Sequence, residues 1–167
     1  IGAGINAPEK QKHVLRVVDK LQKVGLDNIR LELGEGRIDA SGDPIPGVRL
    51  DEATIEKIID FISAKGTSRL DVINTLEGLL PDSEITQEAI AEMRELAGVL
   101  EALGVPEENA WFSPSLTRGL DYYTGPVFET IIPKAPKFGS VMGGGRYNGL
   151  VGRFMEREIP STGMSVG

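Results

Sequence analysis

The sequence predicts an α+β fold, in which a helical domain over residues 1–105 precedes an antiparallel β portion over residues 106–167. Three observations support this division. Residues 1–105 carry 12 Lys and Arg against 19 Asp and Glu, whereas residues 106–167 carry six of each, so the net charge of −7 lies in the first part. Eight of the nine aromatic residues follow position 110. Helical spacing of apolar residues gives way to β-branched and aromatic runs, with Gly104 and Pro106 at the junction.

The first helix is expected to begin near Pro8 and to end at Gly25. Asn6 and Glu9 have the spacing of a capping box, and a proline suits the first helical turn. Apolar residues then recur every three or four positions, namely Val14, Val17, Val18, Leu21 and Val24. Gly25 can adopt the left-handed conformation that ends a helix.

The rest of the first part is expected to hold one strand or hairpin and three helices. Ile29, Leu31 and Leu33 alternate with polar residues, which predicts the strand or hairpin. Asp51 is a good N-cap for a helix with a buried stripe of Ile55, Ile58, Ile59 and Ile62. A shorter helix is expected over 69–80, before Pro81. The longest is expected over 85–103, with an inward face of Ile90, Met93, Leu96, Ala97 and Leu100.

The second part is expected to be built from strands. Residues 127–132 are rich in β-branched and aromatic side chains, and Pro133 ends the run. The chain then returns through residues 138–142 to three consecutive glycines. A short helix around residues 150–154 and a last strand over 164–166 complete the prediction.

The composition is that of a soluble globular protein and excludes several kinds of site. Of the 167 residues, 40% are hydrophobic and 26% are charged. The absence of Cys excludes disulfides and a cysteine nucleophile, and a single His13 excludes paired-histidine metal motifs, so no protein-ligated metal is expected. No apolar run reaches membrane-spanning length, and we expect a cytoplasmic protein. The net charge of −7 argues against non-specific coating of duplex nucleic acid.

Two patterns associated with nucleotide binding are weak in this sequence. Gly2-x-Gly4-x-x-Ala7 matches the dinucleotide fingerprint, but that motif needs a preceding strand to aim the helix at the pyrophosphate, and none is predicted. No Walker A sequence is present. If the protein uses ATP, it does so without a P-loop.

The segment 117–129 is the strongest candidate for a binding site. It places Arg118, Tyr122 and Tyr123 beside a carboxylate and flanking glycines at the start of a strand. Arginine makes bidentate contacts to phosphate or carboxylate, and tyrosine offers a flat apolar face and a hydroxyl to a small polar ring. The pattern fits a small-molecule site. The alternative is a β-hairpin with an exposed arginine and core aromatic residues.

The run Gly143, Gly144 and Gly145, which Arg146 and Tyr147 follow, is a second candidate. Consecutive glycines allow a ligand to approach backbone N–H groups closely. The alternative is a tight turn between a strand and a helix. Residues 109–155 carry five Lys and Arg against two Asp and Glu, and this local charge of +3 suits an anionic substrate.

These segments resemble the two histidine-binding signatures of the histidyl-tRNA synthetases, a family of class II aminoacyl-tRNA synthetases. Residues 118–125 (RGLDYYTG) with 127–129 (VFE) resemble the first signature, and 143–151 (GGGRYNGLV) the second. Residues 160–167 resemble the approach to class II motif 3. The helical part resembles, more loosely, the family's insertion domain, which reaches the tRNA acceptor stem. The expected fold is thus this insertion domain joined to part of a class II catalytic core.

The resemblance implies an activity, a set of partners and a site. The implied enzyme uses ATP, accompanied by Mg²⁺, to convert L-histidine to histidyl-adenylate, and then transfers the histidyl group to the 3′ end of histidine tRNA. It implies a cytoplasmic homodimer. Arg118 is implied as the catalytic cation at the α-phosphate, and the implied histidine-binding residues are Tyr122, Tyr123 and Tyr147. Gly143, Gly144 and Gly145 are implied as backbone next to histidine or the adenylate.

One geometric condition attaches to this site. In a regular strand Arg118 and Tyr123 face opposite sides, so they can address one ligand only if the strand bulges or twists. Gly119 is suited to a bulge.

The sequence also departs from the family pattern. Motifs 1 and 2 are absent, so we expect the chain to be an incomplete piece of the enzyme. One alternative is a catalytically silent paralogue that senses histidine, like the regulatory subunit of ATP phosphoribosyltransferase. Arg118 favours the ligase, because a sensor needs no cation at an α-phosphate. Another alternative is a tRNA acceptor-stem binding module in residues 1–105, against which their acidic balance counts.

Overall fold

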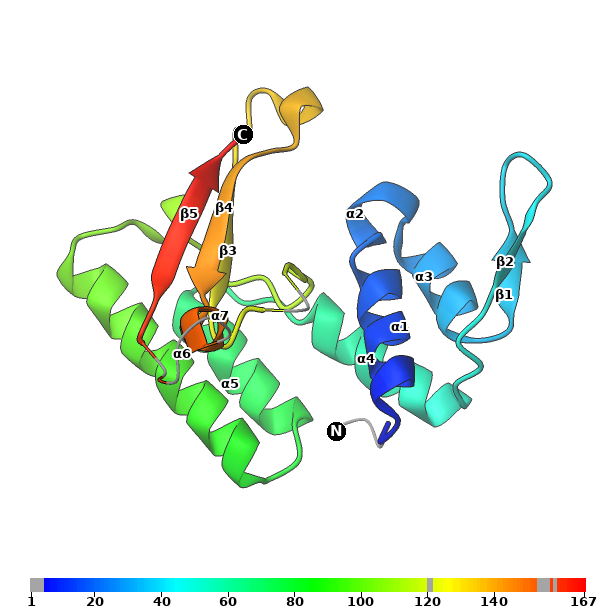
Figure 1. The fold of residues 1–167 in the computed structure, drawn as a ribbon, viewed down its shortest axis with the longest axis horizontal. Helices are drawn as coiled ribbons and strands as arrows, with labels where there is room; N and C mark the ends of the chain where they lie inside the picture. Colours follow the sequence, from blue (N-terminus) through cyan, green and yellow to red (C-terminus); the bar gives the residue numbers. More distant parts are fainter. Residues whose placement is uncertain (1–4, 120–121, 153–156, 158) are drawn as a thin grey trace. The chain divides into compact units, whose positions relative to one another are not determined.

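The computed structural model describes residues 5–119, 122–152, 157 and 159–167. The chain divides into two compact units, Ile1–Ser115 and Leu116–Gly167. The first unit is helical apart from one small hairpin, and the second is built on a three-stranded antiparallel sheet (Figure 1), so the predicted α+β class is confirmed. No helix within the described ranges is long and apolar enough to cross a membrane. Gly2 and Gly4 of the dinucleotide-like pattern lie outside the described residues.

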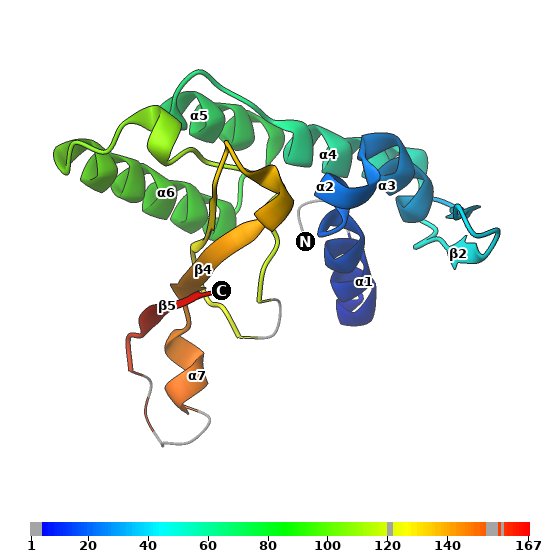
Figure 2. The same cartoon turned by 90° about the horizontal axis from the view of Figure 1, so that it is seen from above.

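The first part of the helical unit combines four helices with a hairpin. The helices are α1 (Pro8–Val18), α2 (Leu21–Val24), α3 (Leu26–Leu33) and α4 (Glu52–Ser63), and the hairpin strands are β1 (Gly36–Ile38) and β2 (Pro44–Pro46). The hairpin projects beyond the helices (Figure 2). The core is aliphatic and consists of Ile5, Val14, Val17, Val18, Ile29, Leu33, Val48, Ile55, Ile58, Ile59 and Ile62. The predicted isoleucine stripe on α4 is therefore confirmed.

The starts and ends of these helices agree only in part with the predictions. Pro8 lies in the first turn of α1 as expected, but the capping box is wrong, because Ala7 is the N-cap and no side chain caps the helix. The predicted continuous helix is also wrong, since α1 ends at Val18 and α2 begins at Leu21. Gly25, with φ +80°, ends α2 as expected. The Asp51 cap of α4 is confirmed, because its carboxylate accepts from the Thr54 N–H at 2.9 Å.

Residues 29–33 are helical, so the predicted strand is wrong at this position. Ile29 and Leu33, four residues apart, are fully buried, whereas Leu31 is 49% exposed. Apolar residues at 29, 31 and 33 fit the alternation of a strand, but residues 29 and 33 also have the i, i+4 spacing of a helix. Because Ile29 and Leu33 are buried and Leu31 is not, the helical spacing is the one that the structure adopts. A hairpin forms later in the chain than predicted, from β1 and β2.

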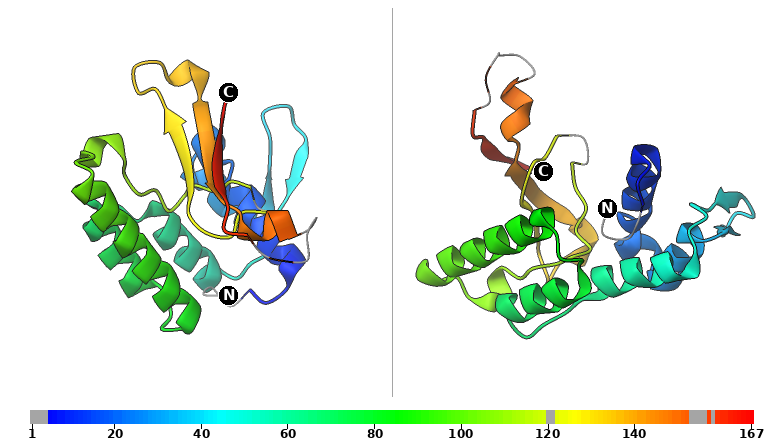
Figure 3. Two further views of the ribbon diagram at one scale, coloured as in Figure 1. Left: turned by 60° about the vertical axis from the view of Figure 1, so that its left-hand side comes forward. Right: turned by 90° about the horizontal axis from the view of Figure 1, so that it is seen from below.

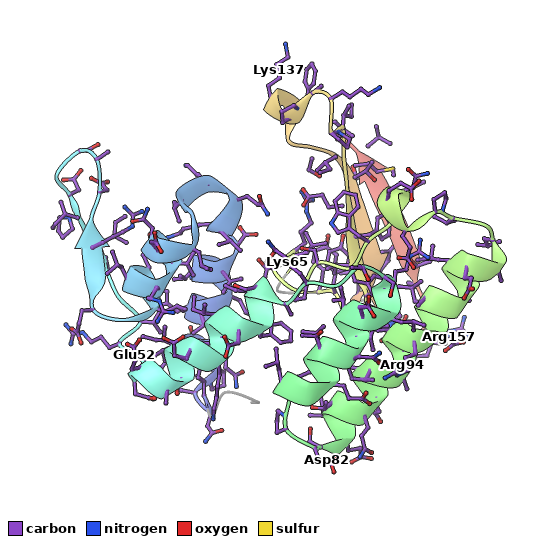
Figure 4. The ribbon with its side chains drawn as sticks, turned by 180° about the vertical axis from the view of Figure 1, so that it is seen from behind. Glu52, Lys65, Asp82, Arg94, Lys137 and Arg157 are labelled. Atoms are coloured by element: carbon purple, nitrogen blue, oxygen red, sulfur yellow. The ribbon has the colours of Figure 1, made fainter. Side chains whose placement is uncertain are left out.

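Helices α5 (Arg69–Leu79) and α6 (Glu84–Ala102) lie side by side and match their predicted spans within two residues (Figure 2). Their small core contains Ile73, Ile90 and Ala97, against which Leu76, Met93 and Phe112 pack. The other predicted inward residues of α6, Leu96 and Leu100, are half-buried. Figure 4 shows Arg94 on α6, and its guanidinium donates to Asn74 at 2.9 Å and to Glu77 at 2.7 Å on α5.

The chain that follows α6 is anchored to the helical unit by a buried arginine. The Arg69 side chain is 3% exposed and donates to the carbonyls of Val105, Pro106 and Ala110 at 2.7, 2.8 and 2.7 Å. A short 3₁₀ helix, η1 (Glu107–Asn109), lies in this segment. Because these contacts and Phe112 hold residues 105–112, the two units divide after Ser115, later than the composition shift near residue 105 predicts.

Glu32 on α3 is a fully buried carboxylate held by two cations. It accepts from Lys20 at 2.9 Å and from Arg37 at 2.8 Å. Burial by itself raises the pKa of Glu32, but the hydrogen bonds and charges of both cations outweigh this effect and hold the pKa below its ordinary value. This contact ties the turn between α1 and α2 to strand β1.

Replacing Glu32 by glutamine is expected to lower the free energy of unfolding at pH 7 by about 2 kcal/mol, because both charge-assisted hydrogen bonds lose their ionised acceptor. The lowered pKa means that this stabilisation is present above the unfolded-state pKa of about 4.3 and is lost as the pH falls through the folded-state pKa. Urea denaturation at pH 7 and pH 3 measures both effects. Glu77→Gln, in an exposed ion pair with Arg94, is the control. Equal losses in the two variants would contradict the assignment.

The second unit is an antiparallel sheet in the order β3-β4-β5. Its strands are β3 (Val127–Ile131), β4 (Ser140–Arg146) and β5 (Thr162–Val166), so the predicted strands at both ends are confirmed. Figure 3 shows β4 in orange between β3 in yellow and β5 in red. A 3₁₀ turn, η2 (Pro136–Phe138), forms the tip of the β3–β4 hairpin, where Figure 4 labels Lys137. Helix α7 (Asn148–Gly152) follows β4.

The alternative of a tight turn at the three glycines is wrong. Gly143, Gly144 and Gly145 lie inside β4, the central strand, and pair with both neighbours. Glycine weakens strand propensity, so the sequence alone favours a turn here. Other groups of this unit fill the space that side chains at these three positions would occupy, which makes the pairing possible.

Candidate functional site

One face of the sheet has a floor made largely of glycine. Residues directly opposite one another in neighbouring strands share a face. Glu129, Gly143 and Ser165 form one such row, and Val127, Gly145 and Gly163 form the next. We call this surface the glycine floor, meaning Gly143, Gly145 and Gly163. Without side chains of its own, the floor allows other groups to approach the backbone closely.

Arg118 lies over the glycine floor. A Cβ at position 143 would lie 2.6 Å from its Nη1 atom, so only glycine leaves room for the guanidinium here. The Nη2 atom donates to Oε1 of Glu129 at 2.5 Å. The side chains of Arg118 and Glu129 remain 37% and 26% exposed. The guanidinium is therefore held in place and still accessible to an anionic ligand.

A turn at Gly119 brings Tyr123 to the same face. Gly119 has φ +55°, and its carbonyl accepts from the N–H groups of both Tyr122 and Tyr123 at 3.2 Å. The Tyr123 ring packs against Gly119 and over Gly145, where a Cβ would lie 2.9 Å from its Cδ1 atom. The expected strand with a bulge is not what joins Arg118 to Tyr123, because β3 begins only at Val127. Between them, Leu120 and Asp121 lie outside the described residues.

The three tyrosines form one cluster. The ring centroids of Tyr122 and Tyr123 are 4.3 Å apart, and each lies 6.3 Å from that of Tyr147. The Tyr147 hydroxyl lies directly over Gly163. A hydrogen bond with Tyr122, together with partial burial, raises the pKa of the Tyr123 hydroxyl above its ordinary value. The Tyr123 hydroxyl is protonated at neutral pH, as a tyrosine of ordinary pKa also is, and it shares a hydrogen bond with Tyr122.

The connection after β4 holds Tyr147 in position. Its N–H donates to the Ser161 carbonyl at 2.8 Å. The adjacent Asn148 accepts from the Ser161 N–H at 2.9 Å through Oδ1 and donates from its own N–H to the Thr124 hydroxyl at 3.1 Å. These bonds tie the chain around Tyr147 to the start of β5 and to the segment before β3.

Six of the seven predicted site residues thus meet on one sheet face: Arg118, Tyr122, Tyr123, Gly143, Gly145 and Tyr147. Gly144 differs, because its absent side chain would point to the other face, toward the Phe128 ring and the Met164 backbone at 2.7 and 2.9 Å. Sequence reasoning missed the roles of Glu129 and Gly163. Glu129 did carry a signal, since it is the only carboxylate in residues 122–152.

The site offers one fixed cation and tyrosine hydroxyl groups above the glycine floor. This arrangement suits a small ligand that has an anionic group for Arg118 and a polar ring for the tyrosines. Among the residues that the structure describes, no three histidine, aspartate or glutamate side chains gather in a way that could hold a metal ion.

Comparison with known proteins places this site in a family. The profile of the family described as histidyl-tRNA synthetase matches residues 47–167, which include the whole glycine floor. The histidine–tRNA ligase of Ruegeria sp. is 42% identical over 166 residues, which is 95% of this chain and 33% of that protein. The ligase of Methylocella silvestris is 40% identical over 162 residues, which is 92% of this chain and 32% of that protein.

Solved structures are similar over almost the whole chain. The crystal structure of histidyl-tRNA synthetase from Nostoc sp. has a TM-score of 0.83 and 32% identity, and the match covers 99% of this chain and 36% of that one. A Bacillus halodurans protein described as an ATP phosphoribosyltransferase regulatory subunit/histidyl-tRNA synthetase has a TM-score of 0.71 and 25% identity, with coverage of 96% and 36%. The chain spans about one third of its curated relatives, and it belongs to the histidyl-tRNA synthetase family.

Proposed function

We propose that this chain is part of a histidine–tRNA ligase, which activates L-histidine with ATP and passes the histidyl group to the 3′ end of histidine tRNA. The observation that carries the proposal is the Arg118 guanidinium over the glycine floor beside three tyrosines. The relatives named histidine–tRNA ligase, about 40% identical, support extending this activity to the longer protein. That longer protein is proposed to be a cytoplasmic homodimer that takes ATP as its magnesium complex.

Arg118 is proposed as the catalytic residue of the activation step. In that step a carboxylate oxygen of histidine forms a bond to the α-phosphorus of ATP, and the bond from this phosphorus to the bridging oxygen breaks to release pyrophosphate. Negative charge gathers on the α-phosphate oxygens during this exchange. A guanidinium fixed beside them offers a planar set of N–H donors and stabilises the transition state more than the bound substrates, which raises the rate.

The tyrosine cluster is proposed to select histidine. The Tyr123 hydroxyl is proposed to bond a ring nitrogen of histidine, with the rings of Tyr122 and Tyr147 beside it. A site whose polar groups need a polar ring rejects phenylalanine strongly, because the hydroxyl groups would be left without partners. The backbone of Gly143, Gly144 and Gly145 is proposed to lie next to histidine or the adenylate.

The two parts of the chain receive different roles in this proposal. Residues 1–105 are proposed as an insertion-type domain that contacts histidine tRNA, and residues 106–167 as part of the catalytic core. The site described above lies wholly within Leu116–Gly167.

Exchange of labelled pyrophosphate into ATP by the full-length protein tests the proposal. We expect exchange that depends on histidine and is absent with phenylalanine, because only histidine satisfies the tyrosine hydroxyls. Calorimetric titration with the same two amino acids measures binding separately from chemistry. Absence of histidine-dependent exchange in a folded full-length protein that binds histidine would reject the ligase.

A second candidate is a histidine-sensing paralogue without adenylation activity. It is favoured by one observation, the similarity to the Bacillus halodurans protein whose description names an ATP phosphoribosyltransferase regulatory subunit. A sensor would bind histidine and show no exchange. Arg118 favours the ligase, because a sensor needs no cation at an α-phosphate, and this guanidinium remains 37% exposed.

A further inference from the structure

Glu129 is the only described residue whose side chain forms an ion pair with Arg118. It lies in β3 directly opposite Gly143, the residue over which the guanidinium stands. Because β3 and β4 pair in register at this row, Glu129 and the floor beneath the guanidinium belong to one sheet. Arg118, by contrast, lies outside the strands, in the segment before the Gly119 turn.

The Arg118 guanidinium is therefore held by two contacts that differ in kind. The absent side chain at Gly143 leaves space for it, and Glu129 supplies the attraction that keeps it there, through the 2.5 Å bond from Nη2 to Oε1. An arginine side chain has many rotamers, and without a fixed partner a half-exposed one samples several of them. A guanidinium has five N–H donors, and the bond to Glu129 uses only one of them, so the others remain for an anionic ligand.

We propose that Glu129 is a positioning residue: it fixes the Arg118 guanidinium over the glycine floor in the orientation that activation requires, and it acts only through Arg118. This inference rests on the proposed function, because it gives Glu129 a part in the activation step. For this role the Glu129 carboxylate has to be ionised, and the Glu129 side chain has to have the right length. Glutamine keeps the shape but loses the charge, and aspartate keeps the charge but withdraws it by one methylene.

The first test compares Glu129→Gln, Glu129→Ala and Glu129→Asp in the full-length protein by histidine-dependent ATP–pyrophosphate exchange. We expect kcat to fall about tenfold for glutamine and about 100-fold for alanine, with little change in the KM for histidine, because a displaced catalytic group costs rate in the transition state. Aspartate should recover part of the loss. Glu77→Gln, in another carboxylate–arginine pair, is the matched control and should retain full activity.

The second test asks whether Glu129 acts through Arg118. In a double variant that also carries Arg118→Ala, the Glu129→Gln change should add no further loss of kcat, since the group that it positions is gone. The inference would be overturned if the losses of kcat in the two single variants multiplied in the double variant, or if Glu129→Gln alone left kcat unchanged. A wild-type protein without histidine-dependent exchange would instead reject the proposed function.

A crystal structure of Glu129→Gln gives a readout that needs no activity. We expect the Arg118 guanidinium to leave its place above Gly143 while strands β3 and β4 keep their register. A guanidinium unmoved from its wild-type position would overturn the inference, whatever the exchange rates.

Discussion

Replacement of Arg118 by alanine in the full-length protein is expected to lower the rate of histidine-dependent ATP–pyrophosphate exchange by about 100- to 1,000-fold. The guanidinium is the only cation held over the glycine floor by the described residues, and the proposed reaction gathers charge at the α-phosphate. Affinity for histidine should fall far less, because its ring is proposed to contact the tyrosines. Exchange kinetics and calorimetric titration measure the two effects separately.

Arg118→Lys is the matched variant for this prediction. Lysine keeps the positive charge but lacks the planar fork that can bind Glu129 and a phosphate at once. We expect it to recover only a small part of the lost rate. Equal losses of exchange rate and histidine affinity in Arg118→Ala would contradict the assigned role, since they would place the guanidinium in ground-state binding.

Alanine at Gly143 and at Gly144 should have opposite effects on activity and stability. At position 144 the new Cβ would meet the Gly163 carbonyl of the neighbouring strand, and the strands must separate to admit it. We expect a loss of about 3 kcal/mol in the free energy of unfolding. At position 143 the close contacts of the Cβ are with the end of the flexible Arg118 side chain, and the Phe128 carbonyl lies at 3.4 Å, which is ordinary contact, so the fold should tolerate the change while the guanidinium is displaced.

Urea denaturation and pyrophosphate exchange, measured on both variants, check this pair of predictions. Gly143→Ala should unfold near the wild-type midpoint and have little exchange activity. Gly144→Ala should unfold at a lower urea concentration. Similar losses in the free energy of unfolding of the two variants would contradict the prediction, because they would show that Arg118 cannot move aside from the new Cβ at position 143.

Much of the helical unit could be predicted from sequence because its determinants are local. The isoleucine stripe of α4 and the Asp51 cap lie within one helix and need no knowledge of the rest of the chain. Residues 29–33 could not be assigned in this way, because two periods fit the same three apolar residues. The choice between them depends on α1 and α4, which bury Ile29 and Leu33.

The candidate site was predictable in its residue types but not in its geometry. Arg118, Tyr122 and Tyr123 are close in sequence and carry their own chemical signal. The sequence does not place the three glycines in a strand, because glycine is a poor strand former, and only the register of β3, β4 and β5 explains why a strand tolerates them. The same register places Glu129 opposite Gly143, a relation that a single sequence does not contain.

The anchoring of the chain by Arg69 has a mechanical consequence. Residues 105–112 are held to α5 and α6, whereas Arg118 stands over the sheet, so only residues 113–117 connect the two attachments. The six Cα–Cα steps from residue 112 to residue 118 span at most about 22 Å when fully extended. The length of this connection therefore limits how far the Arg118 backbone can lie from the chain anchored at residue 112.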